Sequence, residues 1–387
     1  MAVSVETPRV SLPVWLESLL DQVGALFLAF LIALGLGAII VVLYGRSPVE
    51  VYASMLRAAT VAKDAPAYVL ATATPLIFSA LAISICFKGG LFNIGVEGQF
   101  LIGMATASWA ALHLGFLPGP TLLVAVLLFA MLGGMAYAAV PALLKVKTGA
   151  HEVVTTIMMN GMATSLVFWA LSGPLRFTFR PEGQNVDLRT DPFPKNARVP
   201  DLGHLFGFGP APHLSWLFPL AVAAAVVVWF VVSRTRLGYE ARAMGASAGS
   251  ARAGGISIGG VQIKLFLISG ALAGLVGMQQ ILADYGYFPK NYAAMLGFTG
   301  IAVAFLGQNN PIGIVFAAIL WGMLARGESI LQLETKMPRE FVIILQGILI
   351  LSVVITYQLA KRRLARRQVQ RVAAEEAAQT ALAGEEG

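Results

Sequence analysis

The chain has 387 residues, of which 57% are hydrophobic and only 12% are charged, and its mean hydropathy is +0.76. A soluble domain carries about 25% charged residues. This composition, together with several apolar runs of about 20 residues, excludes a soluble globular protein and predicts a polytopic all-α membrane protein. The formal net charge of +7 is typical of the basic segments that membrane proteins keep in the cytoplasm, so it does not indicate nucleic-acid binding.

Residues that could carry catalysis or bind a metal are few. The single cysteine, Cys86, lies inside an apolar run, which leaves no intrachain disulfide and no cysteine-based metal site. The four histidines are scattered without ligand spacing, and the apolar runs contain no P-loop, HExxH or Ser/His pattern. We therefore expect no cofactor, no metal and no catalytic residue, and a transport protein instead of an enzyme.

The apolar runs divide the chain into three parts. Residues 1–20 are expected to form a cytoplasmic segment, residues 21–360 the transmembrane domain, and residues 361–387 a charged cytoplasmic tail. Spans are recognised as runs of about 20 apolar residues, or shorter runs bounded by turn signals. The expected spans are residues 23–44, 68–87, 91–112, 121–144, 153–171, 214–232, 261–283, 295–307, 311–324 and 341–359, with a short helix at 49–63.

The distribution of Lys and Arg sets the expected orientation. The loop 234–260 carries four arginines against one glutamate, and the tail opens with a run of Lys and Arg, so both are expected in the cytoplasm. An even number of crossings must then separate them, which requires two spans within residues 295–324. Residues 295–307 alone extend only about 20 Å, so we expect a partial helix there. The resulting prediction is about ten transmembrane helices with both termini cytoplasmic.

Two apolar segments, one in each half of the chain, are interrupted by glycine and polar residues. They are residues 88–99 and 297–311, and each contains a Gly-Gln pair. Interrupted helices in both halves are typical of transporters built from inverted repeats, and they indicate where the substrate passes. The candidate path residues are Phe92, Asn93, Glu97, Asn160, Phe298 and Thr299.

Two of these candidates have a competing structural interpretation. Glu97 could pair with Lys88 or with a helix terminus, because a carboxylate inside a membrane helix costs about 2.5–3.5 kcal/mol without a partner. Asn160 is expected to hydrogen-bond to a neighbouring helix, and this role is favoured over contact with a substrate.

Four segments carry a resemblance to a known family. They are GGLFNIGVEGQFLIG (residues 89–103), HEVVTTIMMNGMA (151–163), LGYEARAMGASAGSARAGGISI (237–258) and GFTGIAVAFLGQNNPIGI (297–314). The chain resembles, over roughly residues 20–360, the permease subunits of bacterial ABC importers in the nucleoside and simple-sugar group, related to ribose and branched-chain amino acid permeases. The resemblance implies a multi-pass protein of the inner membrane. It also implies separate ABC ATPase subunits, a second permease subunit (a paralogue or an identical copy) and an extracytoplasmic substrate-binding lipoprotein.

The loop 234–260 acquires a role through this resemblance. Its helix formers predict a short helix at 239–253 lying across the cytoplasmic face, and the resemblance implies that this is the coupling helix, which sits in a groove of the ATPase. The residues concerned are Gly238, Glu240, Arg242, Gly245, Ala251, Gly255 and Ile256.

The expected function is therefore that of the permease subunit of an ATP-driven importer of nucleosides or related small polar solutes. A ribose- or galactose-type sugar permease is the alternative within the same class. An ion-coupled secondary carrier is the alternative from another class. It would need buried acidic residues in the later spans, which the sequence does not offer.

Overall fold

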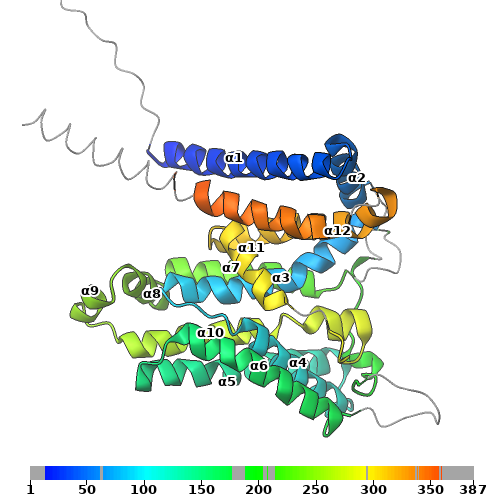
Figure 1. Ribbon diagram of the computed structural model, residues 1–387. Coiled ribbons are helices and arrows are strands. Elements are labelled where there is room, and N and C mark those ends of the chain that lie inside the picture. The colour runs from blue at the N-terminus through cyan, green and yellow to red at the C-terminus, as the bar shows by residue number, and fades with distance from the viewer. Residues whose placement is uncertain are drawn as a thin grey trace, which may run out of the picture. The chain divides into compact units, whose positions relative to one another are not determined.

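The structure is a computed structural model that describes residues 14–61, 64–176, 188–203, 207, 214–292, 295–335, 338, 340–356 and 359. These residues form helices joined by turns and loops (Figure 1), with two isolated β-bridges, Arg189 to Pro289 and Asp201 to Ser215. The prediction of an all-α protein is therefore confirmed for the described part of the chain.

The number of helices that could span a membrane is smaller than predicted. Within the described residues, six helices are long and apolar enough to cross, or seven if Leu28–Leu43 and Pro48–Thr60 count as one bent span. Two further apolar helices, Leu296–Leu306 and Glu340–Thr356, are shorter. The prediction of about ten crossings thus has direct support for six or seven of them.

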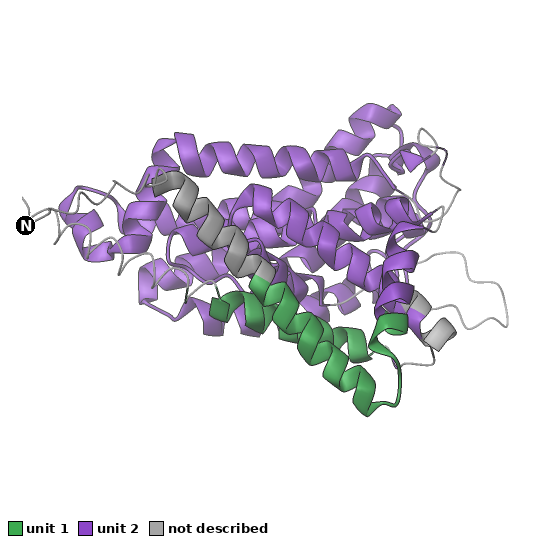
Figure 2. Cartoon of the chain, turned by 90° about the horizontal axis from the view of Figure 1, so that it is seen from above, with its two compact units in different colours: residues 1–51, 340–387 green, residues 52–339 purple. Residues whose placement is uncertain are grey.

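The chain divides into two compact units, shown in separate colours in Figure 2. Unit 1 contains residues 1–51 and 340–387, and unit 2 contains residues 52–339. The described helices of unit 1 are α1 (Val14–Leu43) and Glu340–Thr356, and the first four residues of α2 also belong to it. Most of the predicted N-terminal segment and the whole predicted tail 361–387 lie outside the described residues, and residues 14–20 belong to α1.

Unit 2 is organised around α3 (Ala65–Lys88), whose side chains are buried along almost its whole length. It packs against α7, α10, α11 and α12. A helix with neighbours on every side must be apolar all round, as this sequence is. The remaining elements are α2 (Pro48–Thr60), α4 (Val96–His113), α5 (Gly119–Thr148), α6 (Glu152–Ser172), η1 (Lys195–Ala197), α7 (Leu217–Arg234), α8 (Arg236–Ala246), α9 (Ala248–Ala253), α10 (Ile258–Gly274), η3 (Gln279–Tyr285), α11 (Leu296–Leu306) and α12 (Pro311–Thr335).

Small residues allow α5 and α10 to approach closely. A Cβ added to Gly134 would lie 2.9 Å from the backbone nitrogen of Gly274, and one added to Gly274 would clash with the backbone of Ala130. Contacts of this kind drive helix association in membranes, where the hydrophobic effect between helices is absent. They hold α5 and α10 together as one layer of unit 2.

Two predicted helices are interrupted in the structure. The predicted span 91–112 begins only at Val96, because Gly90 has a positive φ of 69° and Asn93 bonds to the backbone of Gly95 in the loop. The predicted helix 239–253 is two helices, α8 and α9, which meet at Ser247. Ser247 is extended and its hydroxyl accepts from the Ser250 amide at 3.3 Å, which makes it the N-cap of α9.

Two other predicted spans differ in detail from the structure. The predicted span 261–283 matches the candidate span Ile258–Tyr285, but it is α-helical only to Gly274 and then, after a turn, continues as the π-helix η3. The predicted span 311–324 is too short, because α12 continues to Thr335. Gly313, Gly322 and Gly327 lie inside this helix and do not interrupt it.

Candidate functional site

A cavity of about 490 Å³ lies within unit 2, between α3, η3, α11 and α12. Its walls combine three aromatic side chains with neutral polar groups and one carboxylate. The lining residues are Tyr68, Ala71, Thr72, Pro75, Leu76, Gln279, Gln280, Asp284, Tyr285, Leu296, Thr299, Trp321 and Ala325. A volume of this size falls in the range of small-molecule sites.

The depth of the lining residues differs. Trp321 and Gln279 are buried, with 8% and 3% of their surfaces exposed, whereas Tyr285 is 41% exposed and Asp284 is also exposed. The buried part of the cavity wall therefore combines an aromatic ring with an amide, and the exposed part combines an aromatic ring with a carboxylate. Such a surface suits a neutral solute with both a flat apolar face and hydroxyl groups.

The π-helix η3 supplies the polar wall. A π-helical turn holds one more residue than an α-helical turn, which rotates the following side chains, and such turns occur often at functional sites. The hydroxyl of Ser215 donates to Gln279 Oε1 at 2.7 Å, and Gln279 Nε2 donates to Asp284 Oδ1 at 3.2 Å. The first bond links η3 to the residues just before α7, and the second joins two side chains within η3.

Of the predicted path residues, Thr299 lies in the cavity wall. Phe298 is its neighbour in α11 and is partly exposed, outside the lining. Phe92 lies in the loop before α4, and its ring packs edge-on against Phe87 with centroids 4.8 Å apart. The structure thus brings only one of the six predicted residues to the cavity.

Asn93 belongs to a buried polar network that holds the loop between α3 and α4. Its side-chain nitrogen donates to Ser269 Oγ at 2.8 Å and to Gln99 Oε1 at 3.0 Å, and Gln99 donates back to Asn93 Oδ1 at 3.1 Å. Ser269 in turn donates to the carbonyl of Ala82 at 2.5 Å. The network ties α3, α4 and α10 to one another at the point where the chain leaves helical geometry.

Asn160 in α6 forms hydrogen bonds with backbone groups at the break between α3 and α4. Its nitrogen donates to the carbonyl of Ile94 at 3.1 Å, and its oxygen accepts from the amide of Gly98 at 2.8 Å. The first turn of a helix has amides without intrahelical partners, and in a membrane these need a protein acceptor. The predicted hydrogen bond to a neighbouring helix is confirmed.

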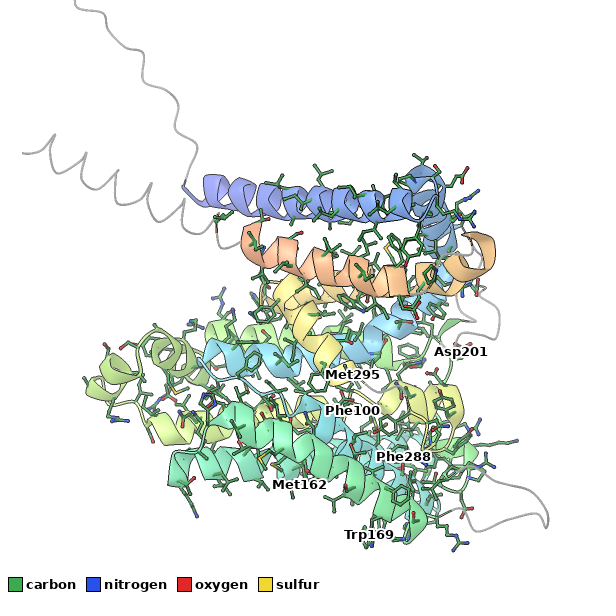
Figure 3. All side chains as sticks on the ribbon, viewed as in Figure 1. Phe100, Met162, Trp169, Asp201, Phe288 and Met295 are labelled. Carbon is green, nitrogen blue, oxygen red and sulfur yellow. The ribbon has the colours of Figure 1, made fainter. Side chains whose placement is uncertain are left out.

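Glu97 caps the start of α11. Its carboxylate accepts from the amide of Met295 through Oε1 and from the amide of Gly297 through Oε2, both at 2.8 Å. Met295, the residue immediately before α11, is labelled in Figure 3. A carboxylate at a helix N-terminus is favoured by the helix dipole. The structural interpretation of Glu97, in which its carboxylate contacts a helix terminus, is therefore present in the structure.

The contact between Glu97 and α11 depends on Gly297. A Cβ at this position would lie 2.5 Å from the Glu97 nitrogen and 2.8 Å from its Cα. On the other side of α11, Ser79 of α3 donates to the carbonyl of Leu296 at 2.9 Å. The two interrupted segments of the sequence therefore meet directly in space.

Most residues of the cavity were missed by the sequence interpretation. Tyr68 and Trp321 were assigned to apolar spans without further role, and Gln279, Gln280 and Asp284 were placed within or at the end of the span 261–283. A signal was present in the sequence, because two adjacent glutamines inside a predicted membrane span are costly unless they face a cavity or protein partners.

The predicted coupling segment lies at one end of unit 2, as α8 and α9 in Figure 1. Thr235 caps α8 by accepting from the amide of Gly238 at 3.3 Å. Arg242 donates to the carbonyl of Val232 in the last turn of α7, where cations are favoured, and Arg236 pairs with Glu240 at 2.7 Å. The bond from Arg242 joins α8 to the end of α7, whereas the Arg236–Glu240 pair lies within α8.

Gly245 is the point where α8 touches the break between α3 and α4. A Cβ at Gly245 would lie 2.5 Å from the carbonyl oxygen of Lys88 and 3.1 Å from the nitrogen of Gly90. The end of α9 is closed by Ile256, whose amide donates to the carbonyl of buried Ala251 at 3.0 Å. Gly255 makes this turn with a φ of 82°.

Comparison with known proteins identifies the class of transporter. The family described as "Branched-chain amino acid transport system / permease component" matches residues 65–354. The glucose ABC transporter permease protein TsgB13 of Haloferax volcanii is 33% identical, over 92% of this chain and 91% of that protein. Two guanosine ABC transporter permease proteins of Bacillus subtilis are also similar. NupP is 32% identical over 85% of this chain and 92% of its own length, and NupQ is 27% identical over 72% and 87%. The chain belongs to the branched-chain amino acid transport system / permease component family and is a multi-pass membrane transport subunit of the ABC transporter type.

Proposed function

We propose that this chain is the permease subunit of an ATP-driven importer that moves nucleosides across the plasma membrane through the cavity between α3, η3, α11 and α12. The observation that carries the proposal is the lining itself. Tyr68, Tyr285 and Trp321 offer aromatic faces for a base, and neutral amide and hydroxyl groups offer partners for a ribose. The similarity to the guanosine permease proteins NupP and NupQ supports the same class of substrate.

A sugar is the second candidate substrate. The glucose permease protein TsgB13 covers nearly the whole chain in its match, and aromatic rings also pack against the apolar faces of sugars. The proposed path includes Thr299, and its position in the cavity lining supports this. For Phe92, Asn93, Glu97, Asn160 and Phe298 a part in the path stays a proposal, beside the structural contacts that each of them makes.

The proposed architecture has ten crossings in two inverted-repeat-like halves, with both termini in the cytoplasm. The direct contact between Glu97 and the start of α11 supports it, because two interrupted helices meeting near the middle of a bundle are typical of repeat-built transporters. The proposed domains are a cytoplasmic segment 1–20, a permease domain 21–360 and a cytoplasmic tail 361–387.

The proposed partners are ABC ATPase subunits, a second permease subunit and an extracytoplasmic binding lipoprotein. The ATPase would dock on α8 and α9, through the region that contains Gly238, Glu240, Arg242, Gly245, Ala251, Gly255 and Ile256. The exposed side chains of Tyr239 and Arg236 support this, since both project from α8. The presence of two similar permease proteins, NupP and NupQ, in one organism supports a heterodimer.

A transport assay tests the substrate. In proteoliposomes that contain the full complex, labelled guanosine uptake should require ATP, and Trp321→Leu should lower it about tenfold, because stacking on an aromatic ring contributes about 1–3 kcal/mol per base. Trp169→Leu is the matched control, since Trp169 is 64% exposed on α6 and outside the cavity lining.

The outcomes separate the candidates. ATP-dependent uptake of glucose without guanosine would favour the sugar permease. Uptake by the purified chain alone, driven by an ion gradient without ATPase subunits, would establish a secondary carrier instead.

A second assay tests the proposed coupling role of α8. Arg242→Glu should abolish substrate-stimulated ATP hydrolysis, because a carboxylate would replace the guanidinium that donates to the Val232 carbonyl and would face the negative end of α7. Arg242→Lys, which keeps the charge, should retain part of the stimulation. Full stimulation in Arg242→Glu would remove the coupling role of this contact.

A further inference from the structure

The helix α11 is bounded at both ends by strained backbone. Among the residues that the structure describes, three non-glycine residues have a positive φ, and all three flank this helix. They are Met295, at 72° just before its first residue, and Gln308 and Asn309, at 55° and 53° just after its end. Asn is tolerated in this region, but Met and Gln are uncommon there. Residues held in such conformations cost free energy and cluster at clamps and switches.

The turn after α11 is also incompletely hydrogen-bonded. Within the described part of the chain, Nε2 of Gln308 and Oδ1 of Asn309 are buried and have no hydrogen-bond partner, whereas buried polar atoms are nearly always paired. The neighbouring Gly307 does not take the positive φ that glycine allows, because its own φ is −78° and a Cβ there would lie 2.6 Å from the nitrogen of Ile314. Another arrangement of this turn could relieve both the strain and the unpaired groups.

Beyond the cavity, α11 lies directly on α3 (Figure 1). Thr299 lines the cavity, and the next residue, Gly300, lies so close to α3 that a Cβ added to it would be 2.6 Å from the Cβ of Ser79. No solute can pass between the two helices while this contact is present. A path that continues from the cavity along α11 therefore requires α11 to move away from α3.

Three aromatic rings close the same seam at the end of α3 that lies against α8. Phe305, in the last turn of α11, packs against Phe87 with ring centroids 5.2 Å apart, and Phe87 packs against Phe92 at 4.8 Å. All three side chains are half-buried. Phe305 follows Thr299 by six residues, about 9 Å along the helix. The rings thus form a second closure between the cavity and the side of the molecule that carries α8.

From these contacts we propose that α11 is the gate of the transport path on the side of α8, and that Phe305 seals it. The inference rests on the proposed function, in which α8 lies in the cytoplasm. In the described conformation the gate is closed. When α11 moves away from α3, the turn at Gln308 and Asn309 leaves the left-handed region and its two buried amide groups gain partners. Strain in the closed turn therefore offsets part of the free energy of separating the rings, as a two-state element requires.

Cysteine accessibility tests the gate without reference to a substrate. Cys86, the single cysteine of the chain, is replaced by serine and Thr299 by cysteine in the full complex. Inside-out membrane vesicles then receive a membrane-impermeant maleimide, and its reaction with this chain is followed by mass spectrometry. Phe305→Ala should raise the labelling rate about tenfold, because the lost ring contacts exist only in the closed arrangement. Phe316→Ala is the matched control, since Phe316 is 69% exposed on α12 and its loss should not change the rate.

The outcomes separate the gate from the proposed function. An unchanged labelling rate in Phe305→Ala, with the complex assembled, overturns the gate and leaves the substrate assays untouched. A complex that labels as expected but takes up neither guanosine nor glucose retains the moving helix and refutes the proposed substrates. If Phe305→Ala does not assemble, Phe305→Leu keeps an apolar side chain without the ring, and its labelling rate should rise about threefold. An unchanged rate in that variant overturns the gate equally.

The turn has a test of its own in the fast-labelling Phe305 variant. Gln308→Gly removes both the strained side chain and its buried nitrogen, so it should favour the closed arrangement and lower the labelling rate about fivefold. Gln262→Gly is the matched control, because Gln262 lies within α10 and has no positive φ, and its rate should stay that of the Phe305 variant. An equal or faster rate in Gln308→Gly would overturn the part of the turn in gating.

Discussion

Replacing Gly245 with leucine should abolish substrate-stimulated ATP hydrolysis while leaving the complex assembled. A Cβ at this position would already lie 2.5 Å from the carbonyl oxygen of Lys88 and 3.1 Å from the nitrogen of Gly90. Both neighbours are backbone atoms and cannot rotate away, so α8 itself must move. Overpacking costs about 1–3 kcal/mol, which is enough to change the population of the native α8 contact about 5- to 150-fold.

The measurement compares ATP hydrolysis with and without substrate in the reconstituted complex. Gly161→Leu serves as the control for a glycine-to-leucine change on a helix, because a Cβ at Gly161 has no neighbour within 4 Å. Basal hydrolysis and the amount of complex should be similar in both variants. Normal substrate stimulation in Gly245→Leu would show that the close contact between α8 and the Gly90 turn has no part in coupling.

The same contact is the first of a series that reaches the cavity. Gly90 leads through the loop to Asn93, whose network holds the start of α4, and Glu97 in the first turn of α4 binds the start of α11. Thr299, one turn into α11, lines the cavity. Leu76, also in the lining, and Lys88 lie 12 residues apart on α3, about 18 Å at 1.5 Å per residue. The contacts from Gly245 to Thr299 thus form a continuous series between α8 and the cavity, through the loop before α4 and the carboxylate of Glu97.

The helices of this fold could be predicted from composition, because apolar runs of membrane length leave few alternatives for the backbone. The breaks were harder to predict. Gly90 and Gly255 adopt positive φ, while Gly134 and Gly274 lie inside helices and serve close packing. A glycine in the sequence does not distinguish these uses, and the neighbour that decides between them is far away along the chain.

The cavity could not be predicted for a related reason. Its lining comes from four elements, with Tyr68 and Trp321 separated by most of the chain. The π-helical geometry of η3 also rotates Gln279 and Asp284 relative to an α-helix, so a projection with 3.6 residues per turn assigns them to the wrong faces. The polar residues that attracted notice, Asn93, Glu97 and Asn160, are the ones that satisfy backbone groups at the breaks.

Glu97 gives the second large expected effect. Glu97→Gln should lower the thermal stability of the complex and nearly abolish uptake, because both carboxylate oxygens accept from backbone amides. A glutamine side chain offers one oxygen, and its NH₂ group would then face an amide donor. Leaving a buried donor unsatisfied costs about 1–3 kcal/mol, and more where a charge is involved.

The thermal midpoint of the detergent-solubilised complex and the rate of guanosine uptake should fall together in Glu97→Gln, since the start of α11 would lose its cap and Thr299 would shift with it. Glu50→Gln is the control, because Glu50 is exposed in the first turn of α2 and its replacement should change the midpoint little. A Glu97→Gln complex that keeps its thermal midpoint but loses uptake would contradict the capping role. It would favour the other interpretation of Glu97, a side chain in contact with the substrate, and the path would then include the start of α4 in addition to the described cavity.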